Sequence, residues 1–210
     1  MRPVYTRAPV ADLPFDLANP TLARRLLRSL DVEGKVPRAI EALGPVGGRE
    51  VILLGGGTTR ARQLEGIGAR VSVVEDWTGH LERPDASVDA VVSFWSAFRD
   101  AGLDELHEVD RVLRSAGRLL VVHDYGRDDV SRLRGDLPEY GSWSRRDGWF
   151  LRNGFRIRVV HCFWTFDTMD AVAAFVQEAF GAAGSAIVAT LKRPRLSYNV
   201  AIYHRTKGGA

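Results

Sequence analysis

From residue 50 onwards, short apolar runs alternate along the chain with segments of helical spacing. The apolar runs have the length and the β-branched content of buried strands, and they lie at 50–54, 70–74, 89–93 and 118–122. Helices are predicted between them at about 58–67, capped by Thr58 or Thr59, and at 103–113, ended by Ser115-Ala116-Gly117. This alternation predicts right-handed crossovers that build a parallel sheet with helices on both faces.

The N-terminal part of the chain lacks this alternation. Residues 1–18 contain three prolines and no sustained periodicity, which indicates an extended arm. Asn19 before Pro20 is typical of a helix start, because asparagine caps the first turn and proline is tolerated in it. Two helices are therefore predicted before the first strand, at 20–29 and 36–43.

The C-terminal part adds two further strands to the predicted sheet. Its predicted elements are helices at 128–133 and 145–153, a strand at 155–164, a helix capped by Asp167 or Thr168, and a strand at 198–204. The fold class is therefore α/β: a Rossmann-like, doubly wound sheet of about six strands, mostly parallel, with a C-terminal antiparallel strand. We divide the chain into an N-terminal arm with helices, 1–46, and an α/β domain, 47–210.

A glycine-rich turn follows the first predicted strand. Gly55-Gly56-Gly57-Thr58 stands where an open parallel sheet usually brings its backbone closest to a ligand. Glycine permits that approach, and the N–H groups of the following helix start can receive an anion. Glu75 ends the next strand, 20 residues after Gly55, where a carboxylate can accept both hydroxyls of a ribose. The pattern favours an adenosine ligand, although three glycines alone also fit a tight turn.

Two other nucleotide sites fit these glycines less well. A dinucleotide site requires a further glycine where this chain has Arg60, and the length leaves little room for a dehydrogenase's substrate domain. A phosphate-binding loop requires Gly-Lys-Ser or Gly-Lys-Thr, which does not follow the glycines. A dinucleotide-binding oxidoreductase therefore remains a minor alternative.

Four segments occur in an order and chemistry that resemble a known family. They are VILLGGGT at 51–58, VVED at 73–76, PDASVDAVVS at 84–93 and RVLRSAGRLLVV at 111–122. Over about 51–124 the chain resembles the class I S-adenosylmethionine-dependent methyltransferases, and its terminal strands look like that family's closing antiparallel pair. The resemblance implies a cofactor site made by Gly55, Gly56, Gly57 and Thr58 at the methionine end, Glu75 at the ribose, Asp76 and Trp77 at the adenine, and Ser93 and Phe94 at the next strand end.

The chain departs from the family at three places. The acid usually found before the first glycine is Leu53, and the usual last glycine of the turn is Thr59. Only 11 residues, 77–87, separate the second strand from the next one, where the family usually has a helix and a further strand. We therefore predict a sheet of six strands, with Trp77 covering the adenine in place of the missing unit.

Candidate catalytic residues must lie at the carboxyl ends of strands. Methyl transfer from a sulfonium is an in-line displacement, which mainly requires alignment and needs a general base only for an acceptor that carries a proton. His123 beside Asp124 could act as that base, and Tyr125 or Trp95 could line an aromatic acceptor pocket. Neighbours along a strand point to opposite faces, so His123 and Asp124 need not touch, and a structural histidine is an equal alternative.

Length and composition limit the function further. The chain has 210 residues, 45% of them hydrophobic and 26% charged, which is typical of one globular domain. Its net charge of +3 comes from arginines scattered along the chain, so no nucleic-acid surface is expected. No long apolar run or secretion leader is evident, which favours a cytoplasmic protein without membrane contact. The single cysteine, Cys162, is expected to be structural, and no metal site is expected.

Two functions of different classes remain. The first is a methyltransferase that takes S-adenosylmethionine and a small-molecule substrate. The second is a non-catalytic relative that serves as a partner or regulatory subunit, which the departures at Leu53, Thr59 and 77–87 favour. The arm at 1–18 is expected either to fold over the cofactor site or to pair with another subunit, so a homodimer is a further expectation.

Overall fold

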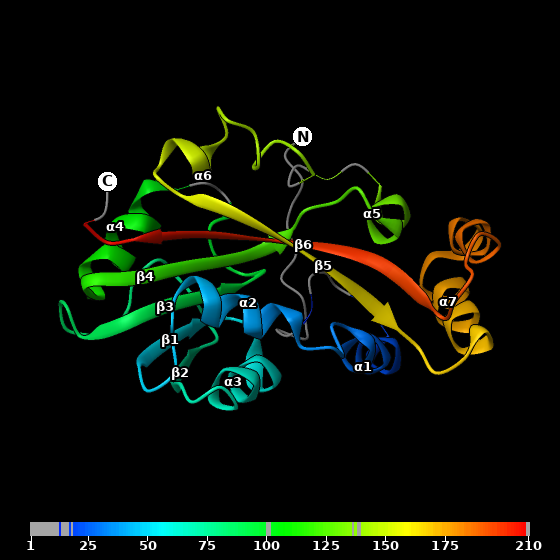
Figure 1. Cartoon of the computed structure of the whole chain (residues 1–210), viewed down its shortest axis with the longest axis horizontal. Helices are drawn as coiled ribbons and strands as arrows, with labels where there is room; N and C mark the ends of the chain where they lie inside the picture. The colour runs from blue at the N-terminus through cyan, green and yellow to red at the C-terminus, as the bar shows by residue number, and fades with distance from the viewer. Residues whose placement is uncertain are drawn as a thin grey trace.

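The computed structural model describes residues 13, 17, 19–99, 102–135, 137 and 140–208. Its centre is one six-stranded sheet with the order β2-β1-β3-β4-β6-β5 (Figure 1). The strands β1 to β4 are parallel to one another, whereas β6 is antiparallel to both β4 and β5. Their bounds are β1 Glu50–Leu54, β2 Arg70–Val74, β3 Val88–Phe94, β4 Leu113–Asp124, β5 Arg156–Thr165 and β6 Arg195–Thr206. The predicted fold class is confirmed.

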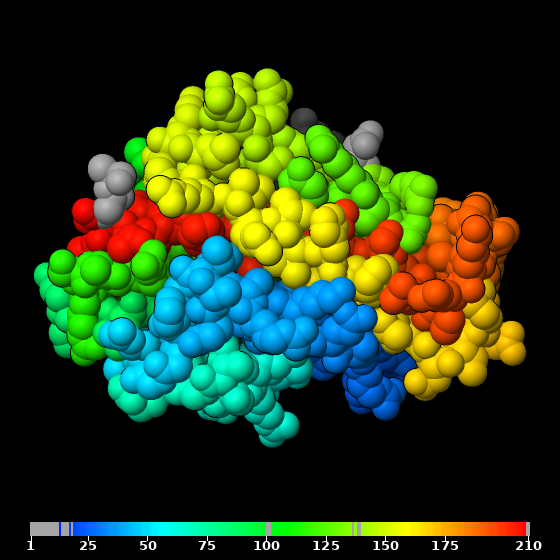
Figure 2. All heavy atoms as spheres, viewed as in Figure 1, coloured from blue at the N-terminus to red at the C-terminus, as the bar shows by residue number. Residues whose placement is uncertain are grey.

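Helices pack on both faces of the sheet and divide the core into two layers. One layer holds the apolar side chains of α1, α2, α3, α5 and α7, and the other holds those of α4 and α6. In the space-filling view the N-terminal helices cross the front of the molecule, and α7 projects at one end (Figure 2). The bounds are α1 Pro20–Ser29, α2 Lys35–Leu43, α3 Gly57–Glu65, α4 Leu103–Val112, α5 Asp129–Arg134, α6 Trp149–Arg152 and α7 Met169–Val188.

Three helix starts follow the capping chemistry that the sequence predicts. The Asn19 side chain accepts a hydrogen bond from the Thr21 N–H ahead of α1. The Asp128 side chain forms a capping box with Ser131 at α5. Thr168 caps α7 by accepting from the Ala171 N–H. These local hydrogen bonds fix where the helices begin, which is why sequence alone located them.

Three local predictions are wrong. Neither Thr58 nor Thr59 caps α3, because the helix already begins at Gly57. The helix α4 ends at Val112 rather than at 115–117, where the chain has instead entered β4 and Ala116 has a φ of 60°. The helix predicted at 145–153 is only α6, because the chain before it is a tight turn in which a Cβ on Gly148 would lie 2.6 Å from the Ser142 carbonyl oxygen.

The short connection at 77–87 contains no strand, as predicted. The Glu108 carboxylate of α4 accepts from the Leu81 N–H, and the Arg111 guanidinium donates to the carbonyl oxygens of Leu81 and Arg83. Hydrogen bonds from Arg111 lower the pKa of Glu108 to about 2. These hydrogen bonds hold the connection against α4. Because the connection adds no strand, β2 lies at the edge of the sheet.

The helix α7 is long and apolar. It has 20 residues and a mean hydropathy of 1.5 in its most apolar 18-residue window, of which 22% is buried, so length and composition alone would let it cross a membrane. The helix is interrupted at Gly181, with φ 57° and ψ −131°, and it packs Val172, Phe175 and Val176 into the core. These features are those of a packed, kinked helix.

Candidate functional site

The glycine turn lies at the point where the strand order reverses. β1 is followed by α3 and then β2 on one side, whereas the next strand, β3, pairs with the other side of β1. Ligands of open α/β sheets bind beyond the carboxyl ends of the strands at such a point. Gly55, Gly56 and Gly57 have φ values of 67°, 77° and 53°, and all three are buried. The sequence therefore placed the turn correctly.

A loop after β3, residues 95–99, covers the ends of the central strands. We call it the capping loop. The Ser96 hydroxyl donates to the Leu54 carbonyl oxygen at the end of β1, with an O–O distance of 2.6 Å, and the Trp95 N–H donates to the Val122 carbonyl oxygen of β4 at 2.9 Å. Trp95 and Phe98 have positive φ values of 53° and 63°, which non-glycine residues rarely adopt. The loop thus bridges three strands in a conformation that local sequence does not favour.

The capping loop and α3 place their own side chains against the first two glycines. A Cβ on Gly55 would lie 2.4 Å from the Ser96 Oγ, and a Cβ on Gly56 would lie 3.0 Å from the Arg60 Cβ. Arg60 is 2% exposed, and its guanidinium lies over the rings of Phe94 and Trp95 at 5.5 and 5.2 Å. The protein's own side chains therefore pack into the space that side chains at Gly55 and Gly56 would occupy.

The predicted ribose and adenine residues are more accessible. Glu75 and Asp76 are exposed just beyond β2. Trp77 is half-buried against the core layer of α4, and its Nε1 is buried without a hydrogen-bond partner among the described residues. Thr58 is exposed in the first turn of α3. One end of the site is thus open to solvent, whereas Ser93 and Phe94 at the other end are buried.

His123 and Asp124 are buried and point to opposite faces of the sheet, as strand geometry predicts. His123 is 1% exposed, and its ring lies 4.7 Å from the Trp143 ring, edge to face. Its Nε2 lies 3.1 Å from the Ala97 carbonyl oxygen, which only accepts, so Nε2 carries the proton. Burial lowers the pKa of His123 well below 6.5, with a further contribution from the Arg99 guanidinium. His123 is therefore neutral and enclosed.

Asp124 is the centre of a buried polar network that the sequence did not indicate. It is 2% exposed and accepts hydrogen bonds from Tyr198 and from the Trp95 Nε1, the latter at 3.0 Å, and it forms an ion pair with Arg134. The network attaches the capping loop to β4 and β6. Tyr125, the third predicted residue, is half-buried, and the Arg127 guanidinium lies 5.7 Å from its ring.

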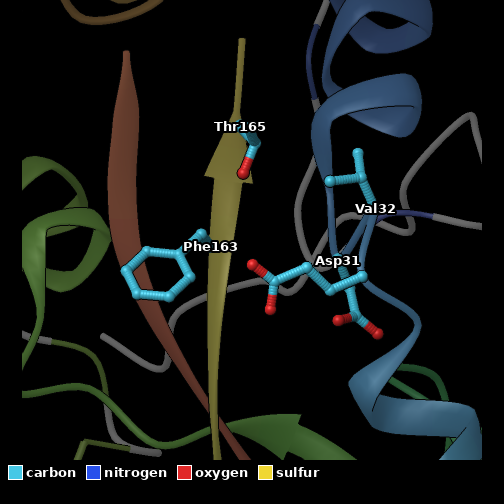
Figure 3. A pocket seen from close by; sticks show the side chains of 5 residues that line it. Asp31, Val32, Phe163 and Thr165 are labelled. Carbon is cyan, nitrogen blue, oxygen red and sulfur yellow. The ribbon is translucent and has the colours of Figure 1, made fainter. Parts of the chain in front are cut away.

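A hollow lies away from this site, between the α1–α2 linker and β5 (Figure 3). The Asp31 carboxylate beside it accepts from the backbone N–H groups of Lys35 and Val36 at 2.9 and 2.8 Å. Phe163 is covered by two cations, the Lys35 Nζ at 5.0 Å and the Arg195 guanidinium at 4.1 Å from the ring. Asp31 and Phe163 already make contacts within the fold, so they do not indicate a ligand site in this hollow.

The described residues fit S-adenosylmethionine at its adenosine end. The exposed Glu75 carboxylate suits the ribose hydroxyls, and the start of α3 presents backbone N–H groups beside it. At the methionine end, the Arg60 guanidinium and the Ser96 hydroxyl have the donor chemistry that an amino-acid carboxylate requires. The Ser96 side chain occupies the space next to Gly55.

Comparisons with known proteins agree on the fold. No family model matches the chain, and no curated protein matches it significantly in sequence. A proposed type II methyltransferase from Anaeromyxobacter dehalogenans is similar in structure, with 19% identity, a TM-score of 0.52, and coverage of 83% of this chain and 96% of that one. A proposed methyltransferase from an antibiotic biosynthesis pathway of Anabaena variabilis has 14% identity, a TM-score of 0.53, and coverage of 84% and 98%. The chain therefore has the class I methyltransferase fold.

Proposed function

We propose that this protein is an S-adenosylmethionine-dependent methyltransferase that acts on a small molecule. The observation that carries the proposal is the glycine turn at the reversal of strand order, with the exposed Glu75 carboxylate at the end of the neighbouring strand. A tight turn alone would not require an accessible acid beside it. When bound, the cofactor would supply an electrophilic methyl group, and the chain's own residues would hold its ribose and align the acceptor.

The burial of His123 limits the class of acceptor. Because Nε2 is engaged with the Ala97 carbonyl oxygen and the ring is enclosed, His123 is not placed to remove a proton from a substrate. An in-line displacement requires no base when the accepting atom carries no proton near neutral pH. We therefore propose an acceptor such as a carboxylate or a thiolate, aligned near Tyr125 at the end of β4.

A second candidate function is supported by the capping loop. The Ser96 to Leu54 hydrogen bond and the buried Asp124 network place the protein's own groups where the methionine end of the cofactor is proposed to bind. If these contacts persist in solution, the chain keeps the fold without binding the whole cofactor. It would then serve as a non-catalytic partner or regulatory subunit.

Calorimetric titration separates the two functions. The purified protein is titrated with S-adenosylmethionine, S-adenosylhomocysteine, adenosine and a nicotinamide dinucleotide. Binding of the first two supports the methyltransferase, whereas binding of adenosine alone supports the closed, non-catalytic relative. Binding of the dinucleotide alone would support an oxidoreductase instead. Binding of none of the four would overturn the adenosyl site and leave only the fold.

Two matched variants test the proposed role of Glu75. Glu75→Gln removes the charge that would accept the ribose hydroxyls, so affinity should fall about tenfold or more, as for a lost hydrogen bond to a charged group. Glu82→Gln makes the same change at another exposed acid, outside the site, and should bind as the wild type does. If the two variants bind the ligand with equal affinity, the Glu75 carboxylate does not contact it.

A further inference from the structure

The outer side of the edge strand β2 is not paired with another described strand. It ends the strand order, and no described strand lies beyond it (Figure 1). Its Val73 side chain is 39% exposed, one of few large apolar side chains exposed among the described residues. The connection that follows is drawn to α4 by Glu108 and Arg111, so it does not pair with β2. Loss of the usual helix and strand has thus uncovered this edge.

The opposite edge of the sheet is protected. In β5 the side chains of Arg156, Arg158 and His161 are exposed, the Lys35 Nζ donates to the His161 carbonyl oxygen, and Leu30 bridges to Trp164. Charged side chains and covering segments are the usual means of keeping edge strands apart. The sequence of β2, RVSVV, has no proline or lysine, and its one charge stands at its first residue.

The backbone of β2 offers two outward-facing residues to a further strand. The Arg70 N–H donates to the Arg49 carbonyl oxygen, and the Val74 carbonyl oxygen accepts from the Gly55 N–H. The backbone N–H and C=O groups of the even-numbered residues therefore face β1. The N–H and C=O groups alternate in direction along a strand. Those of Val71 and Val73 consequently face away from the sheet, where another strand can pair with them.

The charges at the two ends of β2 favour a second copy of this strand as its partner. Arg70 opens the strand, where its half-exposed guanidinium also pairs with Glu50 of β1, and the exposed acids Glu75 and Asp76 follow the last residue of the strand. A second copy of β2 running antiparallel brings each basic end to the acidic end of its neighbour, whereas parallel pairing would bring like charges together. We propose that two copies of this chain pair antiparallel through β2 about a two-fold axis at Ser72.

In this pairing, Val71 of one copy lies opposite Val73 of the other, and each pair exchanges its outward N–H and C=O groups. The exposed Val73 side chain becomes covered. Arg70 lies opposite Val74 of the second copy, next to that copy's Glu75 and Asp76. The second copy therefore contributes a cation to the rim of the open end of the site. The pairing itself does not rest on the proposed function.

Sedimentation velocity across a wide concentration range tests the pairing. The wild type is expected to form a dimer, and Val73→Lys, which places an unpaired charge within the new ladder, should raise the dimer dissociation constant about tenfold or more. Val73→Pro removes the outward N–H without touching the bonds to β1 and should have the same effect. Val32→Lys makes the matched change at another exposed valine and should dimerise as the wild type does.

Charge exchange identifies the register. Arg70→Glu should weaken the dimer by bringing like charges together, and the double variant Arg70→Glu with Glu75→Arg should restore it. Circular dichroism of each variant confirms that the monomer is folded. A wild type that stays monomeric throughout, or a dimer that Val73→Lys leaves unchanged, would overturn the proposal. The titration of the wild type measures ligand binding and not dimerisation, so either result can fail without the other.

Discussion

The two ends of the candidate site beyond the central strands differ in how their polar groups are used. At the β2 end, Glu75 is exposed and no hydrogen bond to its side chain is found within the described residues. At the β3 and β4 end, Ser96, His123 and Asp124 are engaged with carbonyl oxygens or with other side chains. Groups that are buried and satisfied stabilise the fold, whereas exposed ones remain available for a ligand. Residues of similar chemistry thus serve different purposes at the two ends.

The largest expected effect is at Asp124. Asp124→Ala leaves Arg134 without this buried partner and removes the acceptor of the Tyr198 and Trp95 hydrogen bonds, so stability should fall by about 3–5 kcal/mol. Urea unfolding measures the change. Asp147→Ala breaks an exposed pair with Arg145 and should cost less than about 1 kcal/mol. Equal losses in the two variants would contradict the described contrast.

The next effect concerns the glycine turn. Gly55→Ala introduces a Cβ that would lie 2.4 Å from the Ser96 Oγ at a φ of 67°, so it should destabilise the fold by about 3 kcal/mol. Gly48→Ala has a similar φ of 69° with no atom within 4 Å of the Cβ, and should cost only about 1 kcal/mol. If both cost the same, Ser96 does not pack on Gly55 in solution, and the crevice is open.

The pH dependence of stability tests the enclosure of His123. Because its folded pKa lies below the unfolded value of 6.5, the unfolded state takes up a proton that the folded state excludes. Above pH 6.5 neither state takes up this proton, and it does not lower the stability. As the pH falls below 6.5, the unfolded state gains the proton and the free energy of unfolding falls by about 1 kcal/mol for each pH unit. His123→Gln should lose less stability on acidification than the wild type, whereas His107→Gln, at an exposed position, should follow it.

The smallest expected effect on stability is at Glu75. Glu75→Gln replaces an exposed carboxylate and should change the free energy of unfolding by less than about 0.5 kcal/mol. Thermal unfolding with and without S-adenosylmethionine separates this from its effect on binding. A large loss of stability without ligand would show that Glu75 is a structural residue, as Asp124 is.

Sequence patterns located most elements because local chemistry fixes them. The ranges predicted for α1, β1 and β2 coincide with the structure, since a cap or an apolar run marks their ends. The absence of a strand at 77–87 followed from chain length alone. The contacts of the capping loop were not predictable, because positive φ values at Trp95 and Phe98 are imposed by distant partners rather than by their own residue types.

By itself, the sequence determined the order of strands and helices, the number of strands and the place of the glycine turn. Periodicity and short-range capping specify these features, and they need no knowledge of distant contacts. Only the tertiary structure decided that Ser96 and Arg60 occupy the space beside the glycines and that Asp124 belongs to the core. Those outcomes depend on side chains from α3, α5, the capping loop and the strands β4 and β6 meeting at one end of the sheet, and no local pattern encodes such a meeting.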